Sequence, residues 1–273
     1  MKFLIVLGAA LAAATTGYAQ NWGGNISANL GFGSVSADSS TDTIDGAYSR
    51  YGVNGSVGFA LGGNFGVQLD AGYEAANTSS DDYYEASAFT LHANMPLGGF
   101  TVGAFYGFGT GDHPYDSDYG DVSWYGVEAA SILGQGTIAA QLGLMDSASS
   151  HSSLDYSSAF FANVEYRYFI NDNFMLRGNA GFGNFLAHGD PGTGILLAAD
   201  ATYGLGRNFY LTAGVRDFIV TNDGEGSYND LSAHIGITMA FGGNGSLRDS
   251  MASTPMIATM LPSLVAVASS AVD

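Results

Sequence analysis

Five short polar turns recur along this chain of 273 residues. Each turn lies between segments in which apolar residues alternate with small or polar ones. The turns are centred on Gly63, Gly98, Gln135, Asp172 and Arg207, so consecutive centres are 35, 37, 37 and 35 residues apart. A hairpin of two strands of roughly ten residues, with one tight turn and one longer loop, has about this period. The spacing therefore predicts a series of similar β-hairpins.

Alternation of period two runs through every segment between the turns, as residues 65–73 illustrate. One face carries Phe65, Val67, Leu69, Ala71 and Tyr73, whereas the other carries Gly66, Gln68, Asp70 and Gly72. Such faces between residues 25 and 241 predict twelve strands, joined by five tight turns and six longer loops. The polar faces are rich in Gly, Asn, Ser and Thr rather than Lys and Glu, which favours a sheet between two solvents over a soluble sandwich.

The sequence predicts a membrane protein without a transmembrane helix. No run of about 18 apolar residues follows the first 19 residues. Strands that cross a membrane must close into a barrel, because hydrocarbon leaves the polar groups of an open strand edge unsatisfied. We therefore expect an all-β fold, a closed antiparallel transmembrane β-barrel of about 12 strands in up-and-down meander order, over residues 20–241. A secreted β-sandwich or lectin is the competing interpretation.

Aromatic residues gather where the predicted strands end, as they do at the two interfaces of a membrane barrel. Trp124 and Tyr48 also fall near the predicted loop ends. The residues that we assign to the aromatic girdle are Phe65, Phe100, Phe174, Phe209, Phe241, Tyr51, Tyr73 and Tyr125.

Both ends of the chain differ from the central repeat. Residues 1–19 have the pattern of a secretory signal peptide, with Lys2 before an apolar run and Gly17-Tyr18-Ala19 as a small-x-small cleavage site; a buried N-terminal helix is the alternative. Residues 242–273 predict a flexible periplasmic C-terminal tail, because its apolar part is short and interrupted by Pro262. A helix inside the barrel lumen is the alternative for this tail.

Charge narrows the functional classes. The chain has 25 acidic against 7 basic residues and a net charge of −18. Such a surface repels the phosphate backbone, which argues against nucleic acid as a partner. It suits cations, or contact with metal-bridged lipopolysaccharide. The chain has no cysteine, so disulfides and thiolate chemistry are excluded.

Several motifs resemble those of Gram-negative outer-membrane β-barrel proteins of the porin-like group. They are the repeat Tyr-Gly-Val-Asn-Gly-Ser-Val at residues 51–57, the turn Leu-Gly-Gly-Asn-Phe at residues 61–65, and a last strand that closes on Phe241. The resemblance implies a location in the cell outer membrane, in contact with its lipid and lipopolysaccharide. It also implies that Phe241 is part of the signal read by the barrel-assembly machinery, although about 32 residues follow it here.

Charged residues on the inward faces are the candidate functional residues, because a lumen needs few of them. We predict that the pore is lined by Asp70, Glu74, Glu128, Glu165, Asp200, Arg167, Arg177, Arg216, His92 and His234. Four of the acids lie five residues from a predicted turn, and the three arginines of this set lie within residues 167–216. In this pattern Glu165 and Asp200 have cationic neighbours, whereas Asp70, Glu74 and Glu128 have none within a strand or two. It therefore predicts a constriction with one acidic wall and one arginine-bearing wall.

That constriction predicts a modest preference for cations, which replacement of Asp70 and Glu128 by amides should reduce. The eight inward glycines favour open space in the lumen. The alternative is that the charges are ion pairs in a filled barrel. The inward glycines are Gly58, Gly72, Gly103, Gly107, Gly143, Gly181, Gly214 and Gly236.

No group of residues predicts catalysis, a cofactor or a metal site. Ser232 and His234 lie two positions apart on one face of a strand, but no orienting residue or oxyanion site accompanies them. The acidic loop at residues 112–121 lacks the spacing of an EF-hand. The sequence therefore predicts a non-enzymatic channel for passive diffusion of small hydrophilic solutes or ions. A non-conducting structural or surface-interaction barrel, whose loops meet a host or phage partner, is the alternative.

Overall fold

The structure is a computed structural model. The part of the chain that it describes covers residues 22–38, 43–61, 65–78, 83–113, 116–147, 159–187, 190–206, 208–222, 226–242, 246–252 and 254–257. The expected signal peptide at residues 1–19 lies outside these described residues.

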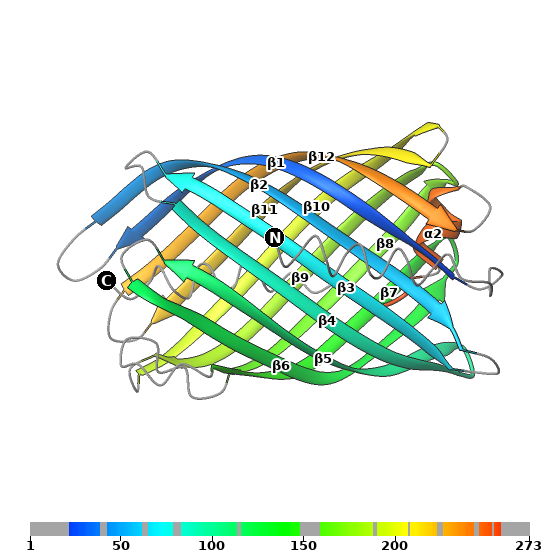
Figure 1. The fold of residues 1–273 in the computed structure, drawn as a ribbon, viewed down its shortest axis with the longest axis horizontal. Helices are drawn as coiled ribbons and strands as arrows, with labels where there is room; N and C mark the ends of the chain where they lie inside the picture. Colours follow the sequence, from blue (N-terminus) through cyan, green and yellow to red (C-terminus); the bar gives the residue numbers. More distant parts are fainter. Residues whose placement is uncertain are drawn as a thin grey trace.

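The described residues form the twelve antiparallel strands that the repeat predicts (Figure 1). They are β1 (Trp22–Asp38), β2 (Thr43–Ala60), β3 (Gly66–Thr78), β4 (Tyr83–Leu97), β5 (Phe100–His113), β6 (Asp116–Leu133), β7 (Gly136–Ser147), β8 (Ala159–Asn171), β9 (Phe174–Ala187), β10 (Asp190–Gly206), β11 (Phe209–Asn222) and β12 (Gly226–Gly242). A short helix, α2 (Leu247–Ala252), follows the last strand.

The sheet closes on itself. Every strand pairs with its neighbours in sequence, and β1 pairs with β12, for example through Asn29 opposite Gly236. Closure leaves no strand edge with unpaired backbone groups, which is the condition for crossing a membrane with strands. The predicted fold class, a twelve-stranded meander barrel, is confirmed.

Tight turns and longer loops lie at opposite ends of the barrel. Two-residue turns join Leu97 to Phe100 and Leu133 to Gly136, and Gly98 and Gly134 adopt φ values of 62° and 60° there. This left-handed conformation costs glycine little, and it matches the twist of the flanking strands. We call this the turn end and the opposite side the loop end; β1 starts and β12 finishes at the turn end.

The barrel is apolar outside and polar inside, as β8 shows. Val164 and Tyr166 are 44% and 40% exposed, whereas Glu165 and Arg167, which alternate with them, are 2% and 6% exposed. A soluble protein has the opposite distribution, because burial of unpaired charge is costly and burial of apolar surface is favourable. The outer face of the barrel therefore matches a lipid environment.

Helices contribute little to the fold. No helix in the described part of the chain is long and apolar enough to cross a membrane. The six-residue helix α2 lies at the turn end (Figure 1). Its Leu247 is fully buried in a cluster with Phe169, Met175 and Tyr210 from the barrel wall.

Candidate functional site

The lumen is the candidate site, and the predicted pore-lining residues point into it. Eight of the ten side chains are nearly or largely buried, and the two most exposed are Glu74 and Arg177, at 29% and 28%. Arg50, which was not among the predicted residues, also faces inward and is 8% exposed. The alternation predicts this position, because Tyr51 and Val53 are on the outer face. The sequence pattern alone could therefore have identified Arg50 as a lumen residue.

On one side of the lumen, two acids share an arginine. The Arg177 guanidinium lies 2.7 Å from Asp200 and 3.8 Å from Glu165. Glu165 also accepts a hydrogen bond of 2.5 Å from Nε of Arg167, and Nε2 of His234 lies 2.9 Å from Asp200. The prediction that Glu165 and Asp200 have cationic neighbours is confirmed.

The prediction that the other acids lack cationic partners is wrong. His92 on β4 lies between Asp70 on β3 and Glu128 on β6, with Nε2 and Nδ1 each 2.9 Å from a carboxylate oxygen. A neutral imidazole has one N–H, so both contacts become hydrogen bonds from His92 only when the ring is doubly protonated. His92 therefore bridges Asp70 and Glu128, and these two acids do not form an acidic wall without cationic partners.

Glu74 also has two cationic partners, one on the neighbouring strand β2 and one across the barrel on β11. Its carboxylate lies 3.6 Å from Arg50 on β2 and 3.8 Å from Arg216 on β11. Arg216 in turn donates a hydrogen bond of 3.0 Å to Asp230 on β12. Acids and cations therefore alternate around the lumen, and the described residues do not form the predicted constriction of two opposite walls.

Several of the inward glycines lie beside filled space. A Cβ on Gly143 would lie 2.6 Å from Cζ of Phe161, and one on Gly126 would lie 2.7 Å from Cζ of Phe105. The indole of Trp124 fills the space beside Gly107 in the same way. At these positions the glycines are recesses for bulky inward side chains of neighbouring strands. The interpretation as open space is therefore wrong for Gly107 and Gly143, whereas Gly72 lines a cavity.

Those bulky side chains fill the lumen beside β5, β6 and β8. Trp124 is fully buried and donates a hydrogen bond of 3.2 Å from Nε1 to Thr90, and it clusters with Phe105 and Phe161. The sequence predicts Trp124 near the loop ends among the aromatic residues there, but its side chain faces inward, since Tyr125 beside it takes the outer position. Tyr48 likewise faces inward, where its hydroxyl donates a hydrogen bond to Asp230.

The predicted girdle residues lie on the outer face. Phe65, Phe100, Phe209, Tyr51 and Tyr125 are exposed. The remaining three are half-buried against outer neighbours: Phe174 against Tyr203, Phe241 against Trp22, and Tyr73 hydrogen-bonded to Glu85. Their role as membrane anchors stays a prediction.

The C-terminal residues differ from the predicted flexible tail over the part that is described. After α2, residues 254–257 lie against the inner wall, where Thr254, Met256 and Ile257 are buried. The backbone of this segment is hydrogen-bonded to Gln68, Gln141 and Arg167. Residues 258–273 lie outside the described residues. The sequence carried no local signal for this docking, since all its partners are remote along the chain.

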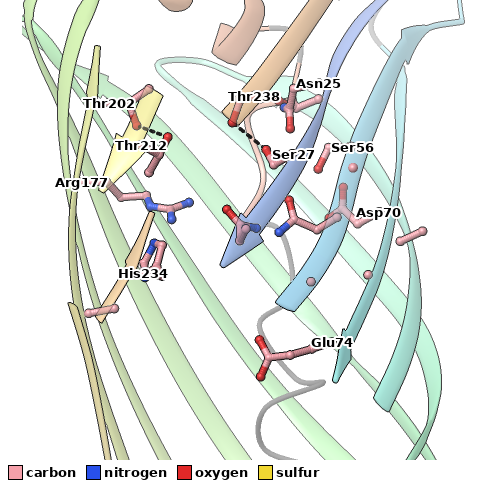
Figure 2. Close-up of a pocket in the computed structure, with 18 of the residues that line it drawn as sticks. Asn25, Ser27, Ser56, Asp70, Glu74, Arg177, Thr202, Thr212, His234 and Thr238 are labelled. Carbon is pink, nitrogen blue, oxygen red and sulfur yellow. Dashed lines mark hydrogen bonds between the residues drawn. The ribbon is translucent and has the colours of Figure 1, made fainter. Parts of the chain in front are cut away.

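A polar cavity of about 210 Å³ remains in the lumen (Figure 2). Amides and hydroxyls from β1 and β2 form one side, including Asn25, Ser27 and Ser56. Thr202 and Thr212, which are hydrogen-bonded at 3.0 Å, and Arg177 and His234 form the other (Figure 2). Glu74 and Asp70 also line the cavity, as do Met251, Thr254 and Met256 of the C-terminal segment. An apolar cavity of about 150 Å³ already accommodates benzene, so this volume suffices for a small solute.

Among the described residues, no group of three or more His, Asp or Glu side chains has an arrangement that would hold a metal ion. His234 contacts Asp200, while the buried hydroxyl of Ser232 has no hydrogen-bond partner in the described structure. The side chains of the acidic loop at residues 112–121 lie outside the described residues.

Comparison with known proteins identifies the fold. No family model matches the sequence, and no curated protein is detectably similar to it. Among solved structures, an outer-membrane channel from Pseudomonas putida F1 is similar with a TM-score of 0.57 and 11% identity, over 80% of this chain and 96% of that one. The translocator domain of the autotransporter NalP from Neisseria meningitidis gives 0.48 and 14%, over 87% and 94%, and the KdgM porin 0.47 and 9%, over 78% and 99%.

Three observations indicate the same class of fold: the closed barrel, its apolar outer face and the likeness to the Pseudomonas putida channel. The protein has the fold of a bacterial outer-membrane β-barrel, and this fold agrees with the outer-membrane location that the sequence predicts.

Proposed function

We propose that this barrel is an outer-membrane channel through which small hydrophilic solutes or ions diffuse passively, without chemical change. The polar cavity in the lumen is the observation that carries the proposal. Its amide and hydroxyl groups, such as those of Asn25 and Ser27, replace part of the hydration of a polar solute. The similar structure from Pseudomonas putida F1 is itself an outer-membrane channel, which supports the same reading.

A modest cation preference is part of this proposal. Among the described lumen residues, six carboxylates face four guanidiniums, and His92 and His234 balance this excess of acid only when both are protonated. The net charge of −18 adds an attractive field for cations around the whole molecule. The carboxylates are Asp70, Glu74, Glu128, Glu165, Asp200 and Asp230, and the guanidiniums are Arg50, Arg167, Arg177 and Arg216.

The alternative is a non-conducting barrel with a structural or surface-interaction role. Two observations favour it: the cluster around Trp124 fills part of the lumen, and the C-terminal segment occupies another part. In that case the loops around residues 36–46, 110–121 and 146–157 would act on lipopolysaccharide or a host or phage partner.

Recordings on the purified full-length protein in planar lipid bilayers test the proposal. We expect stepwise currents, and a reversal potential under a KCl gradient that shows a modest preference for K⁺ over Cl⁻. Bilayers that stay silent, both for this protein and for variants with a displaced C-terminal segment, would favour the structural barrel.

A further inference from the structure

Three polar side chains of the inner wall hold the backbone of residues 254–257. They come from three strands: Gln68 from β3, Gln141 from β7 and Arg167 from β8. Gln68 and Met256 are 188 positions apart in the chain. All these contacts involve backbone groups of the segment, so they depend on its conformation more than on its side chains.

Arg167 matches an extended segment. Its Nη1 donates a hydrogen bond of 3.0 Å to the carbonyl of Thr254, and its Nη2 donates one of 3.1 Å to the carbonyl of Met256. In an extended chain the carbonyls of residues i and i+2 point to the same side. One planar guanidinium can therefore bind both, as it does with a bidentate carboxylate.

Gln68 contacts the segment as a neighbouring strand would. Its Oε1 accepts a hydrogen bond of 3.2 Å from the amide of Met256, and its Nε2 donates one of 3.4 Å to the carbonyl of the same residue. Gln141 donates a further hydrogen bond of 3.1 Å to the carbonyl of Ile257. Pro255, between Thr254 and Met256, has no N–H that would be left unsatisfied.

The wall itself keeps these three side chains in place. Nε2 of Gln68 also donates to Asp70 at 3.0 Å, and Nε2 of Gln141 donates to Glu128 at 3.0 Å. Nε of Arg167 donates to Glu165. Because barrel residues supply these contacts, the donors are oriented before the segment arrives, which lowers the entropic cost of binding.

An apolar recess completes the site. Met256 and Ile257 are 1% and 0% exposed, and they pack with Ala130 and Ala139 of β6 and β7. The small alanine side chains leave room for these larger ones. Burial of these two apolar side chains stabilises the docked segment, whereas a charged side chain at either position would be buried without a partner.

We propose that the inner wall carries a preformed binding site for an extended peptide, that its occupant is this chain's own segment Thr254–Ile257, and that the docked segment is a plug that narrows the lumen. The docking stands on the contacts above. Its effect on conduction rests on the proposed channel function.

Disulfide trapping tests the docking without reference to conduction. The chain has no cysteine, so the variants A139C/I257C and A130C/I257C each contain a single pair of thiols. We expect at least one pair to cross-link on mild oxidation of the folded protein, as read by loss of thiol labelling with a maleimide after the oxidised protein is denatured. A139C alone is the matched control and should remain fully labelled. Absence of cross-linking in both pairs would overturn the docking.

Conductance tests the plug. In the variant M256D/I257D two carboxylates would have to be buried in the apolar recess, so the segment should leave the wall while the wall itself is unchanged. We expect at least about a tenfold rise in open time over the full-length protein. D249N, on α2, is the matched control, and it should leave the open time unchanged. Oxidised A139C/I257C or A130C/I257C, whichever cross-links, should conduct less than its reduced form.

The outcomes separate the two proposals. Open channels whose currents M256D/I257D does not change would overturn the plug and leave the channel function standing. Efficient cross-linking, with silent bilayers for the full-length protein and for M256D/I257D, would overturn both the channel and the effect on conduction, but would support the docking.

Discussion

His92 joins two buried carboxylates across the strands β3, β4 and β6. It is fully buried, and each ring nitrogen is 2.9 Å from a carboxylate oxygen. Burial of Asp70 and Glu128 without this partner would leave like charges close together in a region of low dielectric constant. At the scale of single residues, the lumen therefore depends on matched charges more than on apolar contacts.

Removal of this bridge should destabilise the barrel. We expect H92L to lower the free energy of unfolding by about 3–5 kcal/mol, as for other buried ion pairs that lose one partner. Urea unfolding in lipid vesicles, followed by tryptophan fluorescence, measures the change. The triple variant H92L/D70N/E128Q, in which both charges are gone as well, should recover most of the loss. An H92L protein as stable as the parent would contradict the bridging role.

At this scale the sequence correctly predicted on which face of the barrel each side chain lies, but not which groups surround it. Period two placed all ten predicted lumen side chains on the inner face, because successive side chains of a strand point to opposite faces. It did not reveal that recesses such as Gly107 are filled, since the indole that fills this one comes from Trp124 on another strand. Arg50 was missed, although the same alternation places it inward.

The strands are the elements that the sequence specified most directly. Their outer faces carry exposed apolar residues along their length, such as Val127 near the middle of β6, which is 59% exposed. Leu97 at the end of β4 is as exposed, at 63%, but it lies at the turn end. Exposure alone does not distinguish the two positions; their depth in the bilayer does.

The lipid-facing role of the strands gives a prediction that depends on position. V127R should cost about 2–4 kcal/mol of stability, because its charge would lie near the bilayer midplane, whereas L97R, near the interface, should cost about 0–1 kcal/mol. Urea titrations of both variants in the same vesicles provide the comparison. Equal costs would contradict the assignment of this face to lipid.

At the level of the whole molecule, barrel closure brings distant strands into contact across the lumen. Glu74 on β3 lies within 4 Å of Arg216 on β11, although three strands separate β3 from β11 in the sheet. Glu74 also lines the cavity and is the most exposed of the ion-paired lumen acids, at 29%. If the barrel conducts, this carboxylate is the one that passing ions meet.

Selectivity should therefore respond to Glu74 more than to the buried acids. We expect E74Q to shift the reversal potential under a KCl gradient toward that of Cl⁻, because Arg50 and Arg216 would lose their shared counter-charge. E85Q makes the same chemical change on the outer face, where Glu85 accepts a hydrogen bond from Tyr73, and should have no effect. An unchanged reversal potential in E74Q would contradict the assignment.

The sequence by itself determined the number of strands, the positions of the tight turns and the face on which each side chain lies. These properties are local, because they follow from the twofold period of a strand and from the conformation of short turns. Only the tertiary structure decided which inward groups meet, since closure and strand tilt set the distances across the lumen. The bridge through His92, the filled glycine recesses and the docking of Met256 against Gln68 all depend on such distances.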